Sequence, residues 1–78
     1  MPTGLRSGPH RLFFYSGDGI EPPHIHVERY QDIAKFWLDP VQSASSRGLK
    51  PAELRDIERL VTDHAQELLE AWNEYFAG

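Results

Sequence analysis

The first half of the chain alternates hydrophobic and polar residues in three short runs, a pattern typical of β-strands. An aromatic-rich run over residues 11–16 predicts the first strand, and the run over 24–29 predicts the second. A third run, 34–38, places alternate apolar side chains on one face of its strand. Because the connections between these runs are short, we expect a three-stranded antiparallel meander over residues 10–38.

In the last third of the chain the hydrophobic spacing changes to the 3.6-residue period of an α-helix. One apolar stripe continues throughout, so the pattern predicts a single long helix over residues 51–76. Residues 39–50 contain one proline, one glycine and three serines and are interpreted as a connecting loop. Residues 1–9 are interpreted as a loose terminus. The whole chain, residues 1–78, is therefore expected to be one α+β domain with the meander packed against this helix.

Composition narrows the class of protein. The 78 residues include no cysteine, which excludes disulfides and thiolate chemistry. The formal net charge of −4 argues against a dedicated nucleic-acid binder. No segment approaches the ~20 apolar residues of a membrane span, so we expect a cytoplasmic protein without membrane contact. A domain this small gains stability from a bound metal or from self-association, so a homo-oligomer is expected.

The most informative motif places two histidines, His24 and His26, two residues apart on the second predicted strand. Their side chains therefore point to the same face of the sheet, together with Lys35 and Trp37 of the third strand. A single helix covers only one face, and we expect the histidines on the uncovered one. The pair suits a divalent metal site, general acid–base chemistry, or a hydrogen-bonded polar surface.

These three interpretations stay open at the level of the sequence. A metal site, with zinc as the natural ion, would use His24 and His26, but His64 is expected under the opposite face and is awkwardly placed to complete it. The catalytic alternative is a metal-independent ribonuclease or phosphate-handling enzyme, in which both histidines transfer protons and Lys35 stabilises an anion. In the structural interpretation the histidines hydrogen-bond to loop carbonyls or to Glu28, and no enzymatic activity follows.

The loop before the histidine motif carries two acidic residues, Asp18 and Glu21. Their spacing matches no calcium-binding loop, although carboxylates of this kind can hold a cation. Glycines beside Asp18 and prolines after Glu21 are typical of turns. Both acids are therefore interpreted as turn-forming residues.

Aromatic and acidic residues cluster at the end of the predicted helix. Exposed aromatic side chains beside acids are typical of an interface core with a charged rim. We predict that Trp37, Trp72, Glu74, Tyr75 and Phe76 bind a protein partner or a second copy of the chain. The alternative for Trp72 and Phe76 is that they close the hydrophobic core, and Trp37 could also stack RNA bases.

Two segments, residues 19–27 (Gly-Ile-Glu-Pro-Pro-His-Ile-His-Val) and 34–41, resemble a family of small bacterial proteins known as domain of unknown function 4160. The resemblance extends to the helix and covers about residues 10–77. It implies a gene neighbour from the domain of unknown function 2442 family, in pairs suspected of being toxin–antitoxin-like modules. The resemblance therefore implies a protein partner, with RNA cleavage or transcriptional control as the activities of such pairs. We expect a protein-interaction component of such a pair rather than an enzyme. The resemblance assigns a role to no residue.

Overall fold

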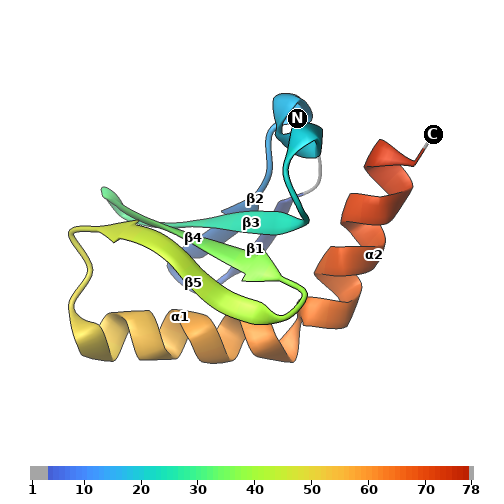
Figure 1. Cartoon of the computed structure of the whole chain (residues 1–78). Coiled ribbons are helices and arrows are strands. Elements are labelled where there is room, and N and C mark those ends of the chain that lie inside the picture. The colour runs from blue at the N-terminus through green and yellow to red at the C-terminus, as the bar shows by residue number, and fades with distance from the viewer. Residues whose placement is uncertain (1–3, 78) are drawn as a thin grey trace.

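The computed structural model describes residues 4–77 and contains a five-stranded antiparallel sheet, a short 3₁₀ helix and two α-helices. The strands are β1 (Gly4–Ser7), β2 (His10–Phe13), β3 (His24–Arg29), β4 (Asp32–Leu38) and β5 (Val41–Arg47). The helices are η1 (Ser16–Ile20), α1 (Pro51–Asp63) and α2 (Ala65–Phe76). Each strand pairs with the next one in the chain, so the sheet is a meander (Figure 1).

The predicted α+β class and antiparallel meander are confirmed, but the prediction of three strands is wrong. Residues 4–7, expected in a loose terminus, pair with β2 as β1. Residues 41–47, expected in a connecting loop, pair with β4 as β5. Every residue of β5 after Val41 is exposed, so this edge strand carries no hydrophobic alternation. Its backbone hydrogen bonds hold it in place, and these leave no signal in the side chains.

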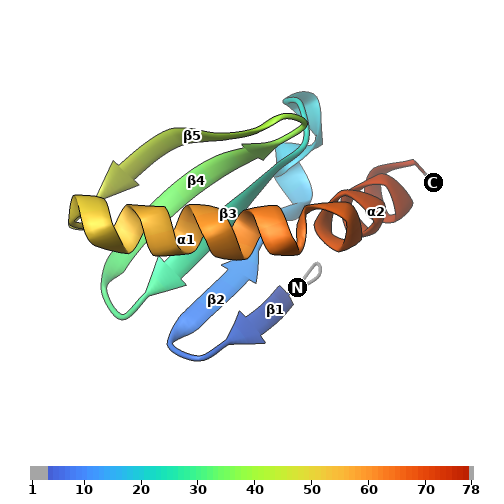
Figure 2. The same cartoon turned by 90° about the horizontal axis from the view of Figure 1, so that it is seen from below.

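The prediction of one long helix is also wrong, because the helix breaks at His64, which has φ −109° and ψ 9°. Four buried residues keep a helical spacing across the break: Ile57, Val61, Leu68 and Trp72. That continuity is why the periodicity indicated one helix. The two helices instead diverge, with α1 lying beneath the sheet and α2 rising past the end of its strands (Figures 1 and 2). Within residues 4–77, neither helix is long and apolar enough to cross a membrane.

The hydrophobic core lies between one face of the sheet and α1. Strand alternation directs Ile25 of β3 and Phe36 of β4 toward the helix, and both side chains are at most 1% exposed. Leu12 and Phe14 lie in the same core, whereas Phe13 packs against His26 on the opposite face. Burying one such side chain contributes roughly 1.5–3 kcal/mol to folding.

The second helix, α2, closes the end of this core and continues past the ends of the strands (Figure 1). Its Trp72 is 4% exposed, and its ring centre lies 5.3 Å from that of Phe14 and 5.0 Å from that of His24. The turn at His64 therefore lets one chain segment cover part of both faces. The expectation that the histidine face lies open holds for only part of that face, because His24 is buried.

Candidate metal centre

The two histidines of β3 lie side by side on the sheet face away from α1, as strand alternation requires. Their ring centroids are 5.1 Å apart. The strand register places His24 opposite Trp37 and His26 opposite Lys35 in β4. These four side chains therefore occupy neighbouring positions on the face that the sequence singles out.

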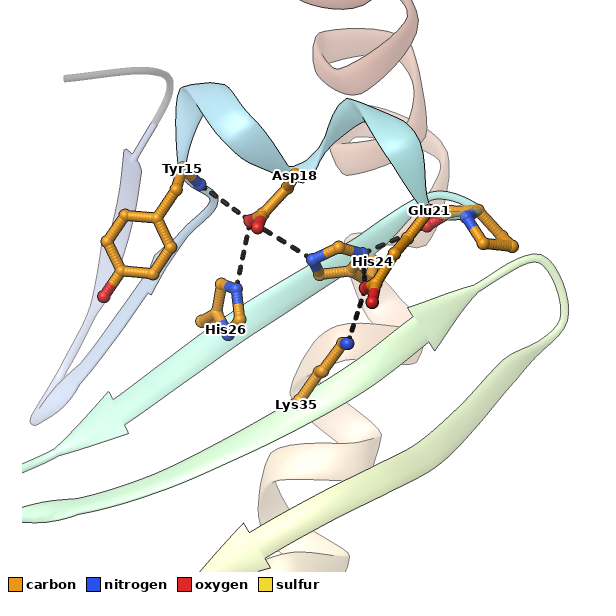
Figure 3. A network of polar contacts seen from close by, with 7 residues as sticks. Tyr15, Asp18, Glu21, His24, His26 and Lys35 are labelled. Carbon is orange, nitrogen blue, oxygen red and sulfur yellow. Dashed lines mark hydrogen bonds and ion pairs between the residues drawn. The ribbon is translucent and has the colours of Figure 1, made fainter.

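A third residue, Asp18 of η1, completes a cluster with both histidines. Its Oδ2 atom lies 3.2 Å from Nε2 of His24 and 3.1 Å from Nε2 of His26 (Figure 3). The Tyr15 N–H donates to the same oxygen at 2.8 Å, and the Asp18 N–H donates to the Tyr15 carbonyl at 3.0 Å. This reciprocal pair of hydrogen bonds closes the turn and holds the carboxylate over β3.

Sequence reasoning missed Asp18 as a partner of the histidines and interpreted it only as a turn-forming residue. Asp18 lies beside the two histidines because η1 folds back over the start of β3 (Figure 3). An acidic residue between two glycines, shortly before a strand with paired histidines, is the signal that could have found it. Glu28, which shares the histidine face of β3, instead pairs with Arg11 at 3.0 Å.

His24 is fully buried, yet one of its ring nitrogens makes no hydrogen bond. Its Nδ1 lies 3.0 Å from the Pro22 carbonyl. Because a carbonyl can only accept, Nδ1 is the donor, and the neutral imidazole then has no proton on Nε2. That Nε2 is at ion-pair distance from Asp18 but has no hydrogen-bond partner among residues 4–77. Two lone pairs facing each other in a buried site are unfavourable unless a cation or a proton lies between them.

The three ligand atoms are spaced for a divalent metal ion. All of them lie within 4.8 Å of one another. The separations of 3.1 and 3.2 Å from the Asp18 oxygen lie between the roughly 2.8–3.1 Å of octahedral neighbours and the roughly 3.3–3.6 Å of tetrahedral ligands on bonds of roughly 2.0–2.2 Å. The Pro22 carbonyl on His24 and the Tyr15 N–H on Asp18 are outer partners of the kind that orient metal ligands. Two imidazoles and one carboxylate are typical of zinc and iron(II) centres that keep positions open.

Electrostatics hold two of the three ligands in the forms that coordinate metals. Burial lowers the pKa of the His26 imidazole, and the nearby Lys35 adds to this effect, although the Asp18 carboxylate opposes it. Burial alone would raise the pKa of Asp18, but the Tyr15 N–H and the two imidazoles outweigh it and keep that pKa below its usual value. A neutral imidazole and an ionised carboxylate lose no net proton when a metal binds, but the Nε2 proton that His26 donates to Asp18 has to move to Nδ1 of the same ring.

Lys35, predicted as an anion-stabilising residue, points into the same region but is ion-paired. Its Nζ lies 2.7 Å from Oε1 of Glu21 and 4.7 Å from the centre of the Trp37 ring. The hydrogen bond from Lys35 lowers the pKa of Glu21. The same Glu21 oxygen lies 3.6 Å from Nδ1 of His24, so this ion pair borders the cluster (Figure 3).

The catalytic alternative requires both histidines to exchange protons with a substrate. His24 is 0% exposed, with Nδ1 on the Pro22 carbonyl and Nε2 facing Asp18, so no substrate reaches it. This geometry disfavours a metal-independent pair of general acid and base. His64 lies at the break between α1 and α2, where its Nδ1 is 2.9 Å from Glu67, and is not part of the cluster.

The five residues predicted to bind a partner differ in how accessible they are. Trp72 is 4% exposed and belongs to the core, so the alternative of core closure holds for this residue. Phe76 and Trp37 are half-buried, and Phe76 packs against the core. Tyr75, at 47% exposure, and Glu74 remain accessible to a partner.

The chain matches the sequence profile of a protein family over residues 10–73, a region that contains all three candidate ligands. The family is described as "Domain of unknown function (DUF4160)". No curated protein and no solved structure matches the chain.

Proposed function

Because the chain belongs to the domain of unknown function 4160 family, whose description states no activity, we propose from the geometry that it binds a divalent transition metal through Asp18, His24 and His26. The observation that carries this proposal is the buried Nε2 of His24, which has no hydrogen-bond partner in the described chain. A bound metal ion would accept the lone pair of this nitrogen, which has no partner among the described protein atoms. It also removes the repulsion between that nitrogen and the Asp18 carboxylate.

A competing explanation is a buried ion pair, in which a doubly protonated His24 donates to Asp18. The 3.2 Å separation allows it, but the atoms are not arranged as a hydrogen bond. Buried ion pairs repay their desolvation only when the hydrogen-bond geometry is good. The ion-pair explanation and the metal proposal predict opposite results when metal is added, so one measurement separates them.

Zinc is the ion that these donors suit best. Imidazole and carboxylate together bind zinc and other first-row divalent ions, whereas calcium and magnesium prefer sites built from oxygen atoms alone. Three protein ligands leave at least one coordination position for water or a substrate. Such a centre can activate water or polarise a bound group, which makes a metal-dependent activity compatible with the site.

The proposal is tested by titrating zinc into the metal-stripped protein and following heat by calorimetry and bound metal by native mass spectrometry. We expect one ion per chain, and loss of binding in His24→Ala and in Asp18→Asn. His64→Gln is the matched control, because this histidine also lies beside a carboxylate, Glu67, but outside the cluster. Binding that is absent, or equally weak in all variants, would overturn the proposal.

A second candidate function, the protein-interaction component of a toxin–antitoxin-like gene pair, is favoured by one observation. Ile20 is 94% exposed and Tyr75 is 47% exposed. Their neighbours Gly19 and Phe76 are closely packed, because a Cβ placed on Gly19 would lie 2.6 Å from the Phe76 ring. The two exposed apolar side chains therefore lie where η1 meets the end of α2. Burying such side chains is a usual source of interface affinity.

The test of this second function is co-purification with the protein encoded by the adjacent gene, which the family resemblance implies is a domain of unknown function 2442 protein. We expect a stable complex that an Ile20→Ser/Tyr75→Ser double variant weakens. A Tyr30→Ser variant, changed at another exposed tyrosine, is the control. A neighbour that does not co-purify, or a complex equally stable in all variants, would contradict it.

A further inference from the structure

A depression beside the candidate metal centre lies on the sheet face that α1 does not cover. Its volume is about 230 Å³, and His26 of the metal centre is one of the residues that line it. Its lining consists of His26, Ile33, Ala34, Lys35, Ser45, Ser46 and Arg47. The register pairs Lys35 with both His26 and Ser45, and Ile33 with Arg47. Because paired residues of neighbouring antiparallel strands share a face, these side chains line one surface.

The depression is positively charged. Among the described residues, Lys35 and Arg47 supply its cationic groups, and no carboxylate lines it. Lys35 also forms an ion pair with Glu21 at the border of the metal cluster. Arg47 is exposed and makes no ion pair with any residue between 4 and 77. A guanidinium without a carboxylate partner, beside a serine hydroxyl, is well suited to hold an oxyanion.

We propose that this depression binds the phosphate group of a small phosphorylated ligand, beside the metal ion of the proposed function, on which this inference rests. Arg47 donates to two phosphate oxygens, the Ser45 hydroxyl donates to a third, and Lys35 supplies a further charge. The volume of about 230 Å³ is below the roughly 300–1,000 Å³ of pockets for drug-sized ligands. It suits a phosphate with a small substituent, whose apolar part would rest on Ile33.

His26 links the two sites, because its Nε2 faces Asp18 while its ring lines the depression. A divalent ion held by Nε2 would add positive charge beside the depression and raise the positive potential at the phosphate position. We therefore expect phosphate to bind on the order of tenfold more tightly to the zinc-loaded protein than to the metal-free protein. By thermodynamic linkage, phosphate raises zinc affinity by the same factor.

The experiment measures binding of inorganic phosphate, uridine monophosphate and uridine to the zinc-loaded chain after removal of free zinc. We expect both phosphates to bind and uridine not to bind. Tighter binding of uridine monophosphate than of phosphate would identify a phosphate ester as the ligand, and the reverse order would identify the free anion. Arg47→Gln should weaken phosphate binding by about tenfold without changing zinc content. Arg55→Gln, at another exposed arginine, which lies on α1, should change neither.

The outcomes distinguish this inference from the metal proposal. Zinc binding without phosphate binding overturns the phosphate site and leaves the metal centre intact. Phosphate binding that is equally tight in Arg47→Gln also overturns the phosphate site, because the anion then lies elsewhere. Loss of zinc content in Arg47→Gln would show that the variant disturbs the metal centre, and a Ser45→Ala variant with normal zinc content then decides the question. If that variant binds phosphate as tightly as the unmodified chain, the inference fails.

Discussion

The two faces of the sheet are built from the same strands by the same alternation, yet different forces stabilise them. The face toward α1 is filled by apolar side chains such as Ile25 and Phe36, each at most 1% exposed. The opposite face carries two imidazoles, which meet the carboxylate of Asp18. Apolar burial is non-directional and scales with area. Polar contacts in a buried site depend on each partner being present and correctly oriented.

This difference indicates where function lies in so small a domain. The apolar face is complete, because its side chains are buried against one another and against α1. The polar face is incomplete, because His24 keeps one buried nitrogen without a partner in the described chain. Unpaired buried polar atoms are uncommon in folded proteins. An incomplete face that also carries two further ligand atoms is therefore the place to expect a bound ion.

The largest expected effect comes from breaking the apolar face. Phe36→Ala removes a side chain that is 1% exposed and should lower the free energy of unfolding by about 3–5 kcal/mol, measured by urea denaturation. Ile57→Val, a milder change in the same core, should lower it by about 0.5–1.5 kcal/mol and remain folded. Ser43→Ala, at the exposed register partner of Phe36, should change it by less than about 0.5 kcal/mol. Equal effects of all three changes would contradict the described core.

The next largest effect should come from completing the polar face with metal. Zinc at about one hundred times its dissociation constant should stabilise the protein by about 2.7 kcal/mol. That corresponds to a rise of roughly 10–20 °C in Tm for a domain of this size, measured by thermal unfolding. His24→Ala should abolish the rise, whereas Ile57→Val should retain all of it. A rise in both variants would mean that zinc acts elsewhere.

A smaller effect should come from displacing η1, which holds Asp18 over the histidines. A Cβ at Gly19 would lie 2.6 Å from the Phe76 ring, whereas one at Gly17 would meet nothing within 4 Å. Gly19→Ala should therefore shift η1 away from α2 and weaken zinc affinity several-fold, equivalent to about 1 kcal/mol, by calorimetric titration. Gly17→Ala in the same turn is the matched control and should bind zinc normally. Equal affinities would mean that the Phe76 ring moves aside and the turn keeps its place.

The smallest expected effect concerns polar contacts at the margin of the apolar face and their contribution to stability. At the start of α1, Glu53 accepts the Lys50 N–H at 2.9 Å and an Arg29 N–H at 2.7 Å. The Lys50 N–H, with help from Arg29, lowers the pKa of Glu53 below its ordinary value of 4.5. Because the folded-state pKa is the lower one, this contribution to stability is complete above the unfolded-state pKa. It is lost as the pH falls through the folded-state pKa.

Glu53→Gln should therefore flatten the decline in Tm between about pH 6 and pH 3. The change is expected to be small, because ion pairs at the surface are screened by solvent. Glu58→Gln, at an exposed position of the same helix, should leave the decline as it is. If the Tm of both variants declines with pH as it does in the unmodified chain, the contacts of Glu53 do not contribute to stability.

Periodicity predicted β3, β4 and the helical stretch because these elements bury side chains at regular intervals. It did not predict β5, whose exposed serines show no alternation. It also did not predict the break at His64, because the apolar stripe keeps its spacing on both sides. Alternation does not say which side of the apolar run in β2 faces the core, and the pairing of Leu12 with the buried Val27 decides it.

By itself the sequence determined that His24 and His26 share a face, because the direction of a side chain along a strand is a local property. Only the tertiary structure decided what they meet there. Asp18 reaches them because η1 folds back over β3, and Trp72 buries His24 because the helix changes direction before α2. Both contacts join residues whose relative positions depend on how separate elements pack. No local pattern specifies that packing.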